Sequence, residues 1–190
     1  MKRILIILLF FVFISCEQVG TKDNETNTIG ATNNLSKSDT IYKDDKTIII
    51  KTKKSVDTLI KFYSNINDSL YVVKPEKIIL NTKLDFTHYE YKKMFITATK
   101  EGVAEEGVNF AGHFCFVYWG CGSPCKLSAV VDMKTGKAYN GINSEIGYEF
   151  KKDSKLLIVN PPDSTGWYNK NEIWQHPSQY IWTGSKFIKL

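Results

Sequence analysis

The stretch NFAGHFCFVYWGCGSPCKLSAVVD, residues 109–132, sets the expectation for the fold. Its segment 114–119 is apolar at successive positions, which is typical of a strand covered on both faces. A second run with strand character follows at residues 127–132, after a loop that carries two cysteines. The stretch therefore predicts a central β-strand, a tight loop and a second strand.

Further strands are expected on both sides of this stretch. Short runs rich in β-branched and aromatic residues, bounded by turn residues, predict them. They lie at residues 47–52, 70–73, 77–80, 138–139, 148–150, 156–159, 179–182 and 186–190. Apolar residues at helical spacing predict a short helix over residues 55–63.

One longer helix is predicted over residues 88–101. Thr87 and Glu90 match a capping box, and Gly102 is expected to end the helix. An apolar stripe with helical spacing comprises Tyr91, Met94, Phe95 and Ala98. One well-capped helix packed on a mostly antiparallel β-sheet is an α+β fold, and this is the predicted class.

The N-terminus has the pattern of a secretion signal. Lys2 and Arg3 precede an apolar run at residues 4–14, which suits a signal peptide and is too short to span a membrane. The run ends in Phe13-Ile14-Ser15-Cys16, which resembles a lipobox, although Leu is usual where Phe13 stands. We expect acyl chains such as palmitate on Cys16; the alternative is an ordinary cleaved signal followed by a chance cysteine.

Three segments follow from this pattern. Residues 1–15 are the predicted lipoprotein signal peptide, residues 16–46 the lipidated cysteine with a disordered tether, and residues 47–190 a single α+β domain. The tether is rich in polar residues and has few large apolar side chains to bury. The chain is thus expected to be exported and lipid-anchored in the bacterial cell envelope, at the inner or the outer membrane.

The charge pattern argues against a nucleic-acid partner. The net charge is +5 over 190 residues, with lysines and acids interleaved. The single arginine, Arg3, lies in the predicted signal peptide, so the mature chain lacks the side chain that best recognises phosphate and guanine. The expected partners are the membrane, through lipid on Cys16, and a cell-envelope protein or glycan.

The cysteine-rich stretch also carries a family resemblance. The NFAGH segment at residues 109–113 and the WGCG-x-x-C loop at residues 119–125 resemble a family of uncharacterised secreted bacterial proteins. The later DSKLLIVNPP (residues 153–162) and YIWTGSKFIKL (residues 180–190) are similar to the same family. The resemblance covers residues 85–190 and implies secretion, but no reaction.

Three cysteines remain if Cys16 is lipidated. Cys121 and Cys125 are four residues apart in a loop that can bring them within the roughly 7 Å that a disulfide needs, and export favours oxidation. We predict a Cys121–Cys125 disulfide. Cys115 is then either a small buried residue of the central strand or a thiol nucleophile activated by His113, two positions away on the same strand face.

A zinc site is the other arrangement that the thiols allow. His113, Cys115, Cys121 and Cys125 are the ligand types of a Cys₃His site. The oxidising compartment competes for these thiols, and one strand separates two of the ligands from the other two. We therefore expect neither a metal nor another cofactor.

Two function hypotheses result. The first is a non-catalytic binding or interaction domain, with Trp167, Tyr168 and Trp174 as candidate ligand-binding residues because they fall in a polar stretch. This hypothesis requires aromatic residues exposed on one face.

The alternative is an envelope hydrolase or thiol enzyme that uses His113 with Cys115 or with Glu105 or Glu106. The simpler interpretation of the two glutamates is a solvated loop after a helix. The enzyme hypothesis requires His113 in a cleft within hydrogen-bond reach of its partner.

Overall fold

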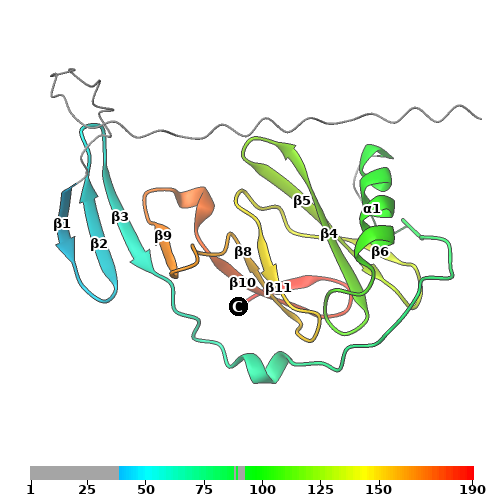
Figure 1. Cartoon of the computed structure of the whole chain (residues 1–190). Helices are drawn as coiled ribbons and strands as arrows, with labels where there is room; N and C mark the ends of the chain where they lie inside the picture. The colour runs from blue at the N-terminus through cyan, green and yellow to red at the C-terminus, as the bar shows by residue number, and fades with distance from the viewer. Residues whose placement is uncertain (1–38, 88, 90–92) are drawn as a thin grey trace, which may run out of the picture. The chain divides into compact units, whose positions relative to one another are not determined.

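The structure, a computed structural model, describes residues 39–87, 89 and 93–190. Within these residues, eleven strands form three sheets in which every strand pair is antiparallel, with 41% strand and 13% helix (Figure 1). The prediction of an α+β fold is therefore wrong, and the chain is mostly β. Its single described α-helix covers one face of one sheet, so most of the packing is between strands.

The central sheet contains the stretch quoted first. Its strands, in order, are β4 (Phe114–Gly122), β5 (Cys125–Asp132) and β6 (Ala138–Asn140). Helix α1 (Lys93–Glu106) packs on one face of β4. A second sheet supplies the apolar cluster on the other face; its order is β11 (Phe187–Lys189), β10 (Ser178–Trp182), β8 (Leu156–Val159) and β7 (Tyr148–Phe150).

The side chains of β4 alternate between these two layers. Cys115 and Val117 belong to the apolar cluster that includes Val103 of α1. Phe114 and Phe116 belong to the cluster that includes Trp182 of β10. The prediction that this strand is covered on both faces is confirmed, because successive residues of a strand point to opposite sides. The prediction that it is central is wrong, because β4 lies at the edge of its sheet and β5 in the middle.

The third sheet differs from the other two in its burial. It comprises β1 (Asp39–Lys43), β2 (Thr47–Lys51), β3 (Val56–Lys61) and β9 (Trp167–Asn169). None of the residues in these four strands is buried; they are half-buried or exposed. β1 occupies residues predicted as tether, whereas residues 16–38 of that segment lie outside the described part of the chain.

The predicted short helix over residues 55–63 is wrong, because most of this segment forms strand β3 (Val56–Lys61). Apolar residues at Val56, Leu59 and Ile60 satisfy helical spacing, but β2 and β9 pair with β3 on both sides and satisfy its backbone. The predicted strand at residues 70–73 is a 3-10 helix, η1 (Asp68–Tyr71), with an isolated bridge at Val72. Residues 77–80 form no strand.

The predicted helix is displaced along the sequence. It runs over Lys93–Glu106, while His88 and the proposed capping residue Glu90 lie outside the described residues. Gly102 does not end it: a Cβ there would lie 2.8 Å from Cγ1 of Val117, so glycine lets α1 approach β4 closely. Gly107, at φ +59°, follows the last helical residue instead.

Candidate functional site

His113 lies in the turn just before β4 and lines a hollow of about 530 Å³. Its Nδ1 atom is 3.8 Å from Oε1 of Glu76, and its Nε2 atom is 3.8 Å from Oδ1 of Asp132. Both distances exceed hydrogen-bond length, so these are ion pairs only when the ring is protonated. Two carboxylates thus flank the imidazole on opposite nitrogens.

Lys134 completes this polar cluster. Its Nζ atom donates a hydrogen bond of 2.7 Å to Oε1 of Glu76, and this bond lowers the pKa of the Glu76 carboxyl; the charges of Lys134 and His113 act in the same direction. The cluster joins the segment around Glu76 to the turn at His113 and to the end of β5. It positions charged groups, but it holds no serine or cysteine nucleophile among the described residues.

We expect the contribution of Glu76 to stability to depend on pH. A carboxyl whose pKa is lowered on folding stabilises the fold above its ordinary value of 4.5, and this stability is lost as the pH falls through the folded-state pKa. Glu76→Gln should therefore lower the urea midpoint above pH 5, and the difference from the parent should shrink in acid. Glu149→Gln, an exposed glutamate of β7, is the control; a pH-independent effect of Glu76→Gln would contradict the expectation.

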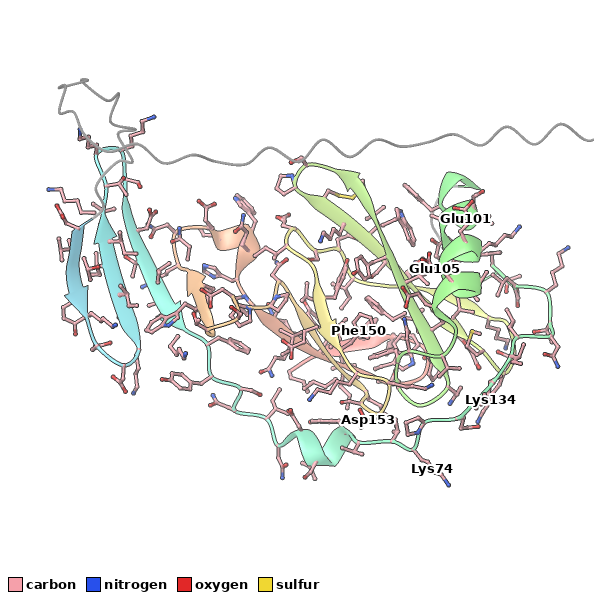
Figure 2. All side chains as sticks on the ribbon, in the orientation of Figure 1. Lys74, Glu101, Glu105, Lys134, Phe150 and Asp153 are labelled. Atoms are coloured by element: carbon pink, nitrogen blue, oxygen red, sulfur yellow. A yellow bond between two sulfur atoms is a disulfide. The ribbon has the colours of Figure 1, made fainter. Side chains whose placement is uncertain are left out.

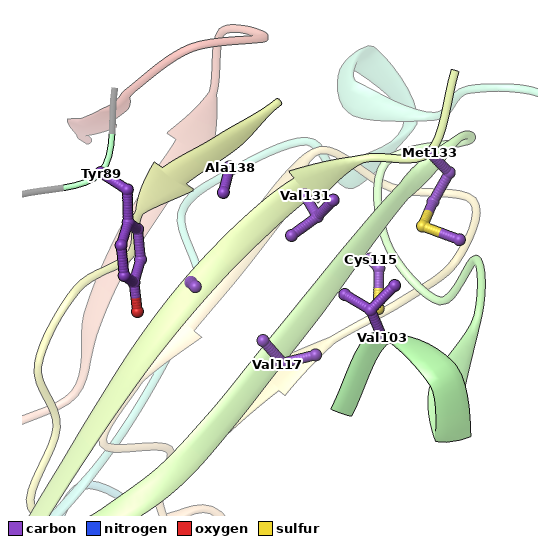
Figure 3. Packing of buried hydrophobic residues seen from close by; sticks show 8 residues of the cluster. Tyr89, Val103, Cys115, Val117, Val131, Met133 and Ala138 are labelled. Atoms are coloured by element: carbon purple, nitrogen blue, oxygen red, sulfur yellow. The ribbon is translucent and has the colours of Figure 1, made fainter. Parts of the chain in front are cut away.

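Cys115 is fully buried in the helix-facing cluster. Figure 3 shows it beside Val103, among Val117, Val131 and Met133. Burial raises the pKa of the Cys115 thiol to about 12, and the negative charge of Glu106 acts in the same direction. No hydrogen bond to the His113 ring is present among the described residues, so the structure does not bring the predicted nucleophile and base together.

The predicted disulfide is present. Cys121 and Cys125 are bonded at the tip of the β4–β5 hairpin, with their Cα atoms 5.2 Å apart. This pair and the burial of Cys115 remove the thiols of the Cys₃His hypothesis. Within the described residues no group of three or more His, Cys, Asp or Glu side chains could hold a metal ion.

Glu105 and Glu106 lie at the end of α1 and are exposed. Figure 2 shows Glu101 and Glu105 along the helix. Glu105 and Glu106 line a hollow of about 220 Å³ together with Tyr118 and Phe150, and His113 does not line this hollow. The predicted pairing of His113 with Glu105 or Glu106 is thus not found among its ion pairs.

The three aromatic candidates have different surroundings. Trp167 and Tyr168 are half-buried on β9, where Nζ of Lys61 lies 5.2 Å from the ring centre of Trp167. Trp174 lies in a 3-10 helix, η2 (Ile173–Gln175), and is 73% exposed; its neighbour Ile173 is 67% exposed. Of the three predicted residues, Trp174 is therefore the one available to a partner.

Asn160 fixes the position of the exposed tryptophan. Its side-chain nitrogen donates a hydrogen bond of 2.7 Å to the backbone carbonyl of Trp174. Its side-chain oxygen accepts hydrogen bonds from the Ser144 hydroxyl and from the backbone N–H groups of Glu145 and Ile146. This buried amide thus attaches the η2 loop to the segment at Ser144–Ile146.

Sequence reasoning missed Glu76, Asp132 and Asn160. Asp132 lies opposite Phe114 in the β4–β5 hairpin. Because the disulfide loop is the turn of this hairpin, counting residues outward from it pairs Asp132 with the residue next to His113. Glu76 lies in a segment without regular secondary structure, and no local pattern points to it.

No helix among the described residues has the length and apolar character needed to cross a membrane. Comparisons of the chain with protein-family models, with curated proteins and with solved structures give no match.

Proposed function

We propose that the chain is a lipid-anchored lipoprotein of the bacterial cell envelope whose folded part is a non-catalytic interaction domain. The observation that carries the proposal is the N-terminal sequence, in which a basic start and an apolar run end at Ser15-Cys16. The proposed kinship with secreted proteins of the NFAGH and WGCG-x-x-C type agrees with this assignment.

The disulfide supports export independently of the N-terminal sequence. Disulfides persist in oxidising compartments and are rare where thiols are kept reduced. The Cys121–Cys125 pair closes a small loop at a hairpin tip, so its effect is local rigidity.

The surroundings of the candidate catalytic groups favour binding over catalysis. The raised pKa of Cys115 makes it a poor nucleophile, because the thiolate is the reactive form. His113 faces carboxylates on both nitrogens, and the buried Cys115 is not hydrogen-bonded to its ring. The exposed pair Ile173 and Trp174 offers an apolar surface to a partner.

Replacement of Cys16 by serine tests the anchor. Cells that express the full chain should incorporate labelled palmitate into the protein, and the Cys16→Ser variant should carry no label. Intact mass should show acyl chains on a chain that starts at Cys16. The matched control is Cys115→Ala, which keeps Cys16 and should be labelled like the parent. An unlabelled parent, or equal labelling of the Cys16→Ser variant, would refute lipidation.

A further inference from the structure

At one end of the third sheet, strands β1, β2 and β3 lie side by side, and β1 begins there at Asp39, the first described residue. In the strand register Asp39 of β1 lies opposite Lys51 of β2, and Lys51 lies opposite Val56 of β3. The β2–β3 turn extends beyond this row with Lys53 and Lys54, and both are exposed. The segment that leads back to Cys16 therefore joins the sheet at the end that carries this lysine turn.

Hydrogen bonds bring the exposed tryptophan loop to the same end. After β9, the backbone N–H of Lys170 donates to the carbonyl of Thr58, and the side chain of Asn171 donates to the carbonyl of Val56 at 2.7 Å. Ile173 and Trp174 follow two and three residues later. We define the basic–aromatic surface as the exposed residues of these two segments: Lys51, Lys53, Lys54, Val56, Ile173 and Trp174.

We propose that the basic–aromatic surface docks on an anionic lipid bilayer, so that the domain lies against the membrane that holds its anchor. The inference rests on the proposed lipid anchor for its orientation. Between Cys16 and Asp39 the chain has 22 residues, and the tether predicted for them from sequence would have an r.m.s. reach of roughly 25 Å. Such a reach would keep the joined end of the sheet close to the headgroups.

The residue types match a membrane interface. Tryptophan favours the headgroup region because its ring is apolar and its N–H is polar, and isoleucine and valine can enter the acyl boundary. Lysines near an anionic leaflet are attracted to it.

Acidic groups at this end oppose the lysines only in part. Asp57 is half-buried and accepts a hydrogen bond from the Ser55 hydroxyl, and Asp39 lies opposite Lys51. Glu172 is exposed beside Ile173, and Lys170, of opposite charge, is exposed two residues earlier. Lys53 and Lys54 are the charges that project from the turn, so they should set the preference for anionic lipid.

Cosedimentation with lipid vesicles tests the proposal. The chain from residue 16 with Cys16→Ser carries no lipid and contains the whole compact unit Ser36–Leu190. It should bind phosphatidylglycerol-containing vesicles and show little binding to phosphatidylcholine vesicles, with the bound fraction falling as salt is added. The double variant K53E/K54E and the variant Trp174→Ser should each lower the partition coefficient about tenfold or more.

Two controls match these changes in chemistry and exposure. K151E/K152E makes the same charge change at exposed positions after β7, and Leu70→Ser removes an apolar side chain that is 73% exposed, like that of Trp174. Both controls should bind like the parent. Equal losses in controls and test variants, equal binding to both vesicle types, or binding only to glycan or envelope protein would overturn the proposal.

The outcome is separable from that of the anchor experiment. Vesicle binding is measured without acylation, so a chain that binds through this surface but is never labelled at Cys16 refutes the anchor alone. A labelled chain whose K53E/K54E and Trp174→Ser variants bind vesicles unchanged refutes the docking surface alone.

Discussion

Asn160→Ala is expected to lower the free energy of unfolding by at least about 3 kcal/mol. The substitution leaves the backbone N–H groups of Glu145 and Ile146 without their acceptor, and each such loss costs about 1–3 kcal/mol. The Ser144 hydroxyl loses one of its two acceptors and keeps the carbonyl of Gly147. The backbone φ of +53° adds to this, because alanine tolerates the left-handed region less well than asparagine. Urea titration of the parent and the variant measures the loss.

An exposed asparagine provides the control for this substitution. Asn65→Ala, in the exposed segment after β3, should change the unfolding free energy by less than about 0.5 kcal/mol. Because Asn160 also holds the carbonyl of Trp174, its loss should increase quenching of tryptophan emission by acrylamide. An Asn160→Ala variant as stable as the control would show that the amide is not the attachment point of the η2 loop.

The thiol of Cys115 is expected to react with iodoacetamide about a thousandfold more slowly in the folded chain than in urea. Its pKa of about 12, against an ordinary value of 9.0, lowers the thiolate fraction by about three orders of magnitude at pH 8, and burial excludes the reagent. The non-reduced chain with Cys16→Ser isolates this thiol, because Cys121 and Cys125 are bonded to each other.

The same measurement decides between the two function hypotheses for Cys115. A buried core thiol stays unreactive across neutral pH and reacts fully once the chain unfolds. A catalytic thiolate would react in the folded state at neutral pH, and replacement of His113 would then slow the reaction. Rapid modification of the folded parent would restore the thiol-enzyme hypothesis.

The parts of the fold that sequence predicted well are those decided by local apolar pattern. The run at residues 114–119 is apolar on both faces, and β4 is covered on both sides as expected. The Cys121–Cys125 disulfide followed from four-residue spacing in a turn, because loop closure over such a distance is local.

The errors arise where distant segments decide the outcome. Residues 56–61 have helical spacing, but pairing with β2 and with β9, more than a hundred residues away, makes them a strand. Gly102 resembles a helix stop by residue type, yet its role is the close approach to Val117. Neither contact is visible in a local window. The fold class is wrong for another reason: the prediction gave one helix the weight of a layer, whereas the described residues are 41% strand and 13% helix.

The candidate site was predicted only in part for the same reason. His113 was identified because it stands in a short stretch with three cysteines, but the predicted carboxylate partners were acids close to it in sequence, Glu105 and Glu106. The ion pairs instead come from Glu76, in a segment without regular secondary structure, and from Asp132, at the end of β5. Trp174 was identified because aromatic residues in a polar stretch tend to be exposed.

The low burial of the sheet β1–β2–β3–β9 has a consequence for cooperativity. Both apolar clusters of the described residues lie outside this sheet, so burial of apolar side chains adds little to the stability that its backbone hydrogen bonds provide. It should open as a separate unit, with amide protons that exchange faster than those of β4 and β5. A bilayer that binds the lysine turn in the folded state would then slow that exchange, because binding stabilises this least protected part of the fold against local opening.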